Sequence, residues 1–123
     1  MSWQDDVLTE VGQGMGVEGL DFSGTGVASF EFERSGTLYI ERQEEGVLIY
    51  MCRALPERDI APVLLQSLKL CHYTQSQSFP LQVGAQEDEQ LFLCIYLADD
   101  EFNRPNVESV IQLLSGYFDS LKL

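Results

Sequence analysis

The chain has 123 residues, with 20 acidic side chains against 7 basic ones and a formal net charge of −13. This length predicts one domain around one core. Acidic chains that are intrinsically disordered are poor in apolar residues, and the apolar content of 45% therefore excludes disorder for this chain. Nucleic acid and anionic membranes are disfavoured as partners, because binding to either needs a surplus of Lys and Arg.

The sequence also indicates a soluble protein of the cytoplasm. Residues 1–6 lack the basic and apolar parts of a secretory signal. The longest apolar run, residues 91–98, has eight residues, whereas a membrane-spanning helix needs about 20. The three cysteines, Cys52, Cys71 and Cys94, are odd in number and widely spaced, which predicts reduced and mostly buried thiols.

The first half of the chain predicts a helix followed by three strands. Apolar residues at helical spacing between Trp3 and Met15 predict a helix of about a dozen residues, with Ser2 and Asp5 spaced as in a capping box. This helix is expected to end within the run of glycines Gly12, Gly14, Gly16 and Gly19, because glycine loses much backbone entropy when ordered. Short loops containing glycine then separate three β-rich runs, which indicates two antiparallel hairpins. The predicted strands cover residues 27–33, 37–41 and 47–52.

The second half of the chain predicts two further strands between two helices. The predicted elements are a helix over residues 60–74, strands over 81–85 and 90–97, and a last helix from residue 103 onward. Asp59 is placed to cap the middle helix, which tolerates Pro62 in its first turn, and Asn103 and Pro105 open the last helix. The order α-β-β-β-α-β-β-α predicts an α+β domain with a five-stranded, mainly antiparallel sheet.

The predicted middle helix has more apolar surface than one core needs. At about 100° per residue its apolar side chains cover an arc of roughly 220°, whereas packing on one sheet needs little over 100°. These side chains are Ile60, Val63, Leu64, Leu65, Leu68, Leu70 and Cys71. Either the last helix packs against the excess within one monomer, or the chain self-associates through this helix about a two-fold axis.

The third and fifth predicted strands are apolar on both sides. In residues 47–52 and in residues 91–97, the side chains on one side of the strand and those on the other side are all apolar. If all three helices lie on one side of the sheet, the other face is an exposed apolar patch of the kind that marks a partner site. If helices cover both faces, no such patch remains.

Several short motifs resemble binding or catalytic sites but lack the context or the spacing that such sites need. Residues 14–19 match a dinucleotide fingerprint, but they follow a predicted helix and not a strand, which indicates a loop that ends the helix. His72, the single histidine, points about 100° away from Cys71 on a helix, and zinc-ligand spacing is missing. The acidic runs 87–89 and 99–101 lack the spaced ligands of a calcium loop. We expect no catalytic residue, no metal site and no cofactor.

Short segments spread over nearly the whole chain point to one known family. They are Met1-Ser2-Trp3, Ser35-Gly36-Thr37-Leu38, Arg53-Ala54-Leu55, Pro80-Leu81 and Gln90-Leu91. In this order and spacing, within a small acidic domain that has surplus apolar surface, they resemble the class I chaperones of bacterial type III secretion. Among these chaperones the chain is most similar to the SycN-like branch.

The resemblance implies a bacterial cytoplasmic chaperone without ATPase activity. Such a chaperone binds the N-terminal region of a secreted effector or gatekeeper protein in extended form and keeps it export-competent. Class I chaperones are dimers, and SycN-like members pair with a second small chaperone, so a homodimer and a heterodimer both stay open. The alternative function is a small acidic dimeric adaptor or scaffold without an export client.

The resemblance also implies two groups of site residues. The expected dimer interface on the middle helix comprises Val63, Leu64, Ser67, Leu68, Leu70 and Cys71. The expected client-binding residues, which would share one face of the sheet, are Tyr39, Tyr50, Phe92 and Tyr96.

Overall fold

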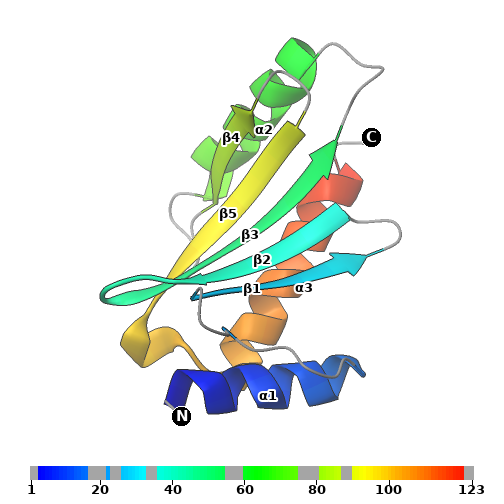
Figure 1. The fold of residues 1–123 in the computed structure, drawn as a ribbon. Helices are drawn as coiled ribbons and strands as arrows, with labels where there is room; N and C mark the ends of the chain where they lie inside the picture. The colour runs from blue at the N-terminus through cyan, green and yellow to red at the C-terminus, as the bar shows by residue number, and fades with distance from the viewer. Residues whose placement is uncertain are drawn as a thin grey trace.

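The structure, a computed structural model, describes residues 3–16, 22, 26–32, 36–54, 60–74, 81–86 and 90–120. Within these residues the chain forms three α-helices, five strands and one short 3-10 helix (Figure 1). The elements are α1 (Trp3–Met15), β1 (Val27–Phe32), β2 (Gly36–Arg42), β3 (Gly46–Ala54), α2 (Ile60–Thr74), β4 (Gln82–Gln86), β5 (Gln90–Ala98), η1 (Asp99–Glu101) and α3 (Arg104–Ser120). The predicted order of helices and strands is confirmed, and η1 is an addition.

The five strands form one antiparallel sheet in the order β1-β2-β3-β5-β4. The predicted meander of the first three strands is confirmed, with Tyr39 opposite Tyr50 across β2 and β3. The chain then passes through α2, forms β4 at the sheet edge, and returns through β5 between β4 and β3. The two strands that are apolar on both sides, β3 and β5, therefore lie next to each other inside the sheet.

The core lies on one face of the sheet. Helix α3 packs against β3 and β5, α1 packs against α3, and α2 lies against β4; Figure 1 shows α2 and α3 behind the strands. The sheet contributes Ala28, Leu38, Ile40, Val47, Ile49, Met51, Leu91, Leu93, Ile95 and Leu97 to the core, and the helices contribute Leu8, Val11, Val63, Val107, Val110, Leu114 and Phe118. Every second residue of β3 and β5 thus faces the helices, as the alternation of strand side chains requires.

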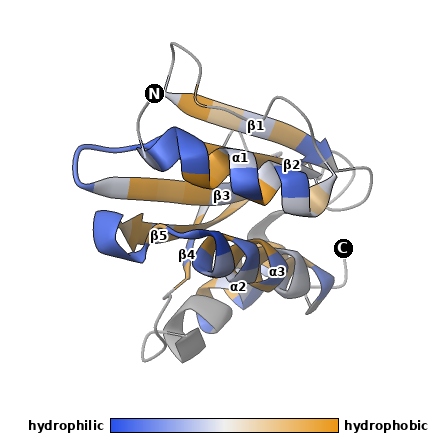
Figure 2. Ribbon diagram, turned by 90° about the horizontal axis from the view of Figure 1, so that it is seen from below, coloured by the Kyte–Doolittle hydropathy of each residue, from blue (hydrophilic) through white to orange (hydrophobic). Residues whose placement is uncertain are grey.

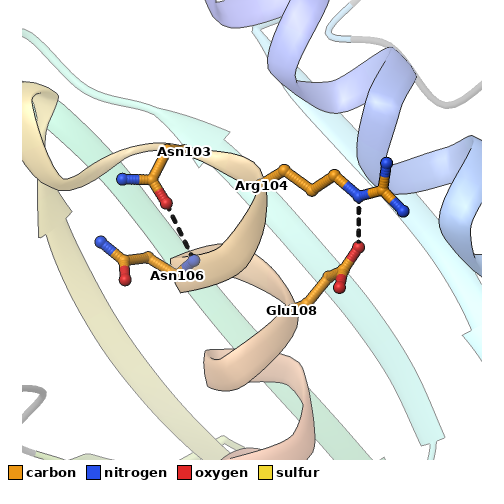
Figure 3. A network of polar contacts seen from close by, with 4 residues as sticks. All are labelled: Asn103, Arg104, Asn106 and Glu108. Atoms are coloured by element: carbon orange, nitrogen blue, oxygen red, sulfur yellow. Dashed lines mark hydrogen bonds and ion pairs between the residues drawn. The ribbon is translucent and has the colours of Figure 1, made fainter.

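The start of α3 is fixed by a cap and packed closely on α1 (Figure 3). The Asn103 side-chain oxygen accepts a hydrogen bond from the Asn106 backbone N–H at 2.9 Å, which confirms that Asn103 opens this helix. Arg104 Nε donates to Glu108 Oε1 at 2.7 Å. A Cβ on Gly14 of α1 would lie 2.9 Å from the outer ends of both of these flexible side chains, so this ion pair lies against α1 at the glycine.

Aromatic rings join α1 to the segment between η1 and α3. The Phe102 ring lies 5.9 Å from the Trp3 ring and 6.4 Å from the Phe22 ring, measured between centroids. Phe22 is fully buried, and the Arg42 guanidinium at the end of β2 lies 4.8 Å above its ring. These contacts tie the N-terminal helix to the same core that the strands form.

The first helix continues through Gly12 and Gly14, where the sequence already predicted its end, and it ends after Met15, at Gly16. The Gly16 φ of +73° belongs to the left-handed region that glycine adopts without strain, and its N–H donates to the Gln13 carbonyl oxygen at 3.2 Å. Residues 17–19 of the glycine-rich motif, the caps expected at Ser2 and Asp59, and the side chain of His72 lie outside the described part of the structure.

Gly36→Ala is expected to lower the free energy of unfolding by about 1–3 kcal/mol. Gly36 has a φ of +103°, and an added Cβ would collide with the Cys52 carbonyl oxygen on β3. Urea denaturation followed by circular dichroism measures the change. Gly116→Ala on α3 is the matched control, because its Cβ would meet open space and alanine in a helix gains about 0.5–1 kcal/mol. A Gly36→Ala variant as stable as the wild type would contradict this hairpin geometry.

Candidate functional site

The face of the sheet opposite the core is lined by aromatic and apolar side chains, and no described helix packs on it (Figure 1). We call this surface the open face. It includes Val27, Ser29, Glu31, Thr37, Tyr39, Glu41, Leu48, Tyr50, Cys52, Gln82, Gln90, Phe92, Cys94 and Tyr96. Figure 2 shows β3 and β5, the strands at its centre, drawn largely in the colour of hydrophobic residues. Of the two arrangements left open by the sequence, the described helices follow the one that covers a single face.

Three of the four expected client-binding residues form one aromatic cluster on the open face. The Tyr39 and Tyr50 rings stack with centroids 5.0 Å apart and planes 16° from parallel. The Phe92 ring packs edge-on against Tyr50 at 6.2 Å. Such pairs add to the stability that ring burial gives. We call Tyr39, Tyr50 and Phe92 the aromatic cluster.

Tyr96, the fourth expected residue, lies on the same face beside this cluster. It is opposite Leu48, which is the neighbour of Tyr50 along that side of β3, and 42% of its surface is exposed. A Cβ on Gly46 would collide with the Tyr96 ring, so the ring lies directly over this glycine. The expectation that all four residues share a sheet face is confirmed, and their role in binding stays a prediction.

The charges on the open face are acidic. Within the described strands, Glu31 and Glu41 are its only charged side chains. The two arginines of β2 and β3 point to the core side, where Arg42 lies over the Phe22 ring and Arg53 lies 4.7 Å over the Phe118 ring. The open face therefore combines aromatic surface, exposed at Tyr96 and half-buried at Tyr39, Tyr50 and Phe92, with negative charge.

Two of the three cysteines lie on the open face as thiols. Cys52 is buried and Cys94 half-buried, as the sequence predicts, whereas the Cys71 side chain is outside the described part. The Cys52 thiol lies 3.4 Å from the Gln90 side-chain oxygen, and burial raises the pKa of Cys52. A raised pKa reduces the thiolate fraction, so Cys52 is a poor nucleophile.

The side of α2 that faces the core includes two of the residues expected at a dimer interface. Val63 is 8% exposed and belongs to the core cluster. Ser67 is fully buried, and its hydroxyl donates to the Val63 carbonyl oxygen at 2.9 Å. Both side chains are therefore occupied within the chain itself.

The outer side of α2 carries exposed leucines. Leu68, an expected interface residue, is 50% exposed, and Leu65, which the expected interface omits, is 55% exposed. Leu64 is half-buried between this side and the core. The side chains of Leu70 and Cys71 lie outside the described part. We call Leu64, Leu65 and Leu68 the α2 strip.

The Tyr50 phenol is expected to ionise above its ordinary pKa of 10.0, first because burial disfavours the phenolate and second because the Glu41 carboxylate repels it. The folded chain then holds this proton more tightly than the unfolded chain. The resulting contribution to stability is present below about pH 10 and falls as the pH rises further.

NMR titration of ring-labelled tyrosine measures the Tyr50 midpoint. Glu41→Gln should lower that midpoint only in part, because burial is the larger cause. Glu44→Gln, at an exposed carboxylate in the turn after β2, should leave it unchanged. A wild-type midpoint at or below 10.0 would contradict the burial of Tyr50 in the aromatic cluster.

No described helix is both long enough and apolar enough to cross a membrane. Several solved structures share the fold, among them the following three. SycH of Yersinia pestis, solved with a stable fragment of YscM2, aligns with a TM-score of 0.72 and 14% identity over 96% of this chain and 98% of that chain. A chain of the heterodimeric ExoU–SpcU complex of Pseudomonas aeruginosa aligns with a TM-score of 0.67 and 21% identity over 95% and 93%. A chain of the ExsC–ExsE complex aligns with a TM-score of 0.76 and 15% identity over 92% of this chain and 86% of that chain.

At these identities the solved structures establish the fold alone, and no curated protein is detectably similar in sequence. The family of this chain is shown by its match to a protein-family model. The family model for the type III secretory system chaperone SycN matches residues 3–119. Since this match spans nearly the whole chain and the fold agrees with it, the chain belongs to the SycN family of type III secretion chaperones.

Proposed function

We propose that this chain acts in the bacterial cytoplasm as a chaperone that holds the N-terminal region of a secreted effector or gatekeeper protein in extended form and keeps it export-competent. The observation that carries the proposal is the open face, an apolar surface with no described helix over it, in a member of the SycN family. Related folds were solved with a YscM2 fragment and in complexes with ExoU and ExsE.

The open face suits an extended client segment. Tyr39, Tyr50 and Phe92 present ring surface from three adjacent strands, so one segment crossing the sheet would contact all three. Burying that surface is favourable by about 25 cal/mol per Å², and ordering the segment opposes much of this gain. Binding is therefore reversible, and it needs neither a nucleotide nor a catalytic group.

Pairing with a second small chaperone belongs to the same proposal. The α2 strip exposes leucines on the side of α2 that faces away from the core. Exposed leucines gathered on one helix favour a helix-mediated interface with a second copy or with a similar chain. The net charge of −13 keeps such a chain soluble before it pairs.

Affinity isolation from the native host is expected to recover one larger secreted protein with this chain. Tyr50→Ser combined with Phe92→Ser should lower the recovered client at least about tenfold, because two ring contacts are lost. Gln112→Ala on α3, exposed and on the opposite side of the sheet, is the control and should leave recovery unchanged. Equal recovery by all three proteins would exclude the open face as the client site.

Leu68→Glu is expected to weaken pairing about a hundredfold, because an interface would bury the new carboxylate without a partner. Multi-angle light scattering of the purified chain, alone and with any co-purified small chaperone, measures the assembly. Gln66→Glu adds the same charge at another exposed position of α2 and should leave the assembly intact. If Leu68→Glu remains assembled like the wild type, the interface does not involve the α2 strip.

A further inference from the structure

Two carboxylates flank Tyr39, the ring of the aromatic cluster nearest to β1. Glu41 lies two residues further along β2 on the same face, and Glu31 lies on β1 diagonally across from Tyr39. Same-face neighbours along a strand are about 7 Å apart, and diagonal neighbours across strands are about 7–8 Å apart. A group placed on the Tyr39 ring is therefore within reach of both carboxylates.

One face of the Tyr39 ring is turned toward β1. The 5.0 Å between the Tyr39 and Tyr50 centroids is close to the strand spacing of about 4.8 Å, so the nearly parallel stack runs across the strands. Tyr50 covers one face of the Tyr39 ring, and the residue opposite on β1 is Ser29. Ser29 is exposed, and its side chain is too small to cover an aromatic ring. The diagonal neighbours of Tyr39 on β1 are Glu31 and the half-buried Val27, so the ring face toward β1 is bordered by one carboxylate and one apolar side chain.

The chemistry of this position favours a cation. An aromatic ring face attracts Lys and Arg through its quadrupole, and a nearby carboxylate strengthens a hydrogen bond from either side chain. The described strands place no basic side chain of their own on the open face, because Arg42 and Arg53 lie over rings on the core side. After burial, repulsion by the Glu41 carboxylate is the next cause that raises the pKa of Tyr50, in keeping with its place on the same face.

We propose that Tyr39, Glu31 and Glu41 form a site for a Lys or Arg side chain of the client segment that lies on the open face. This inference rests on the proposed function, because the cation belongs to the client. It specifies a client segment in which a basic residue stands beside apolar residues, the latter contacting Tyr50 and Phe92. Acidic segments are disfavoured by the same two carboxylates.

Selection from a randomised peptide library displayed on phage tests the site. Wild-type protein should enrich Lys and Arg next to apolar residues about fivefold over the starting library. Glu31→Gln combined with Glu41→Gln should bring this enrichment close to the starting frequency, and Tyr39→Leu should reduce it. Glu44→Gln combined with Glu45→Gln changes the net charge equally at two exposed positions between β2 and β3, and should keep the enrichment.

The outcomes separate this site from the proposed function. Apolar peptides that bind the wild type, fail to bind Tyr50→Ser/Phe92→Ser and show no excess of Lys or Arg overturn the cation site alone. Enrichment that persists in Glu31→Gln/Glu41→Gln overturns it as well. Peptides that bind the Tyr50→Ser/Phe92→Ser variant as well as the wild type contradict the proposed function, and recovery of no peptide contradicts both.

Two further results would also overturn the site. Loss of enrichment in Glu44→Gln/Glu45→Gln would assign the preference to net charge and not to Tyr39 and its neighbours. A Tyr39→Ser variant that becomes monomeric in light scattering, while the wild type is a dimer, would place a second copy of the chain on the open face.

Discussion

The fold depends on the pairing of two strands that are apolar on both faces. Residue for residue, β3 pairs with β5 from Gly46 opposite Ala98 to Ala54 opposite Gln90. Because strand side chains alternate, this pair supplies one apolar layer to the core and a second to the open face. The described helices pack on only one of these layers. Exposed apolar surface is thus built into the two central strands and does not result from an incomplete core.

The apolar part of the open face is bordered by polar side chains on the two edge strands, β1 and β4. Ser29 and Glu31 on β1 and Gln82 on β4 lie on the open face to either side of the apolar centre. An apolar centre with a polar rim is characteristic of a binding surface, since the rim stays hydrated when the centre is covered. The strand order β1-β2-β3-β5-β4 produces this arrangement directly.

Much of this fold follows from the sequence, but the orientation of α2 does not. Alternation and turn residues locate the strands, and the position of Asn103 locates the start of α3. The apolar arc of α2 is too wide for periodicity to show which part faces the core. In the structure the core side of α2 is the side that carries the buried Val63 and Ser67. The Ser67 hydroxyl can be buried there because it donates to the Val63 carbonyl oxygen, a bond that any helical serine can form. Leu65 lies on the outer side of α2 together with Leu68, and the expected interface included Leu68 but omitted Leu65.

The two candidate partner surfaces are physically separate. The α2 strip belongs to a helix that packs against β4 on the core side, whereas the aromatic cluster belongs to β2, β3 and β5 on the open face. They share no residue and lie on opposite sides of the sheet, so a partner confined to the α2 strip would leave Tyr39, Tyr50 and Phe92 accessible. On the proposed function, one small acidic domain would in this way hold a second chaperone and an extended client at the same time.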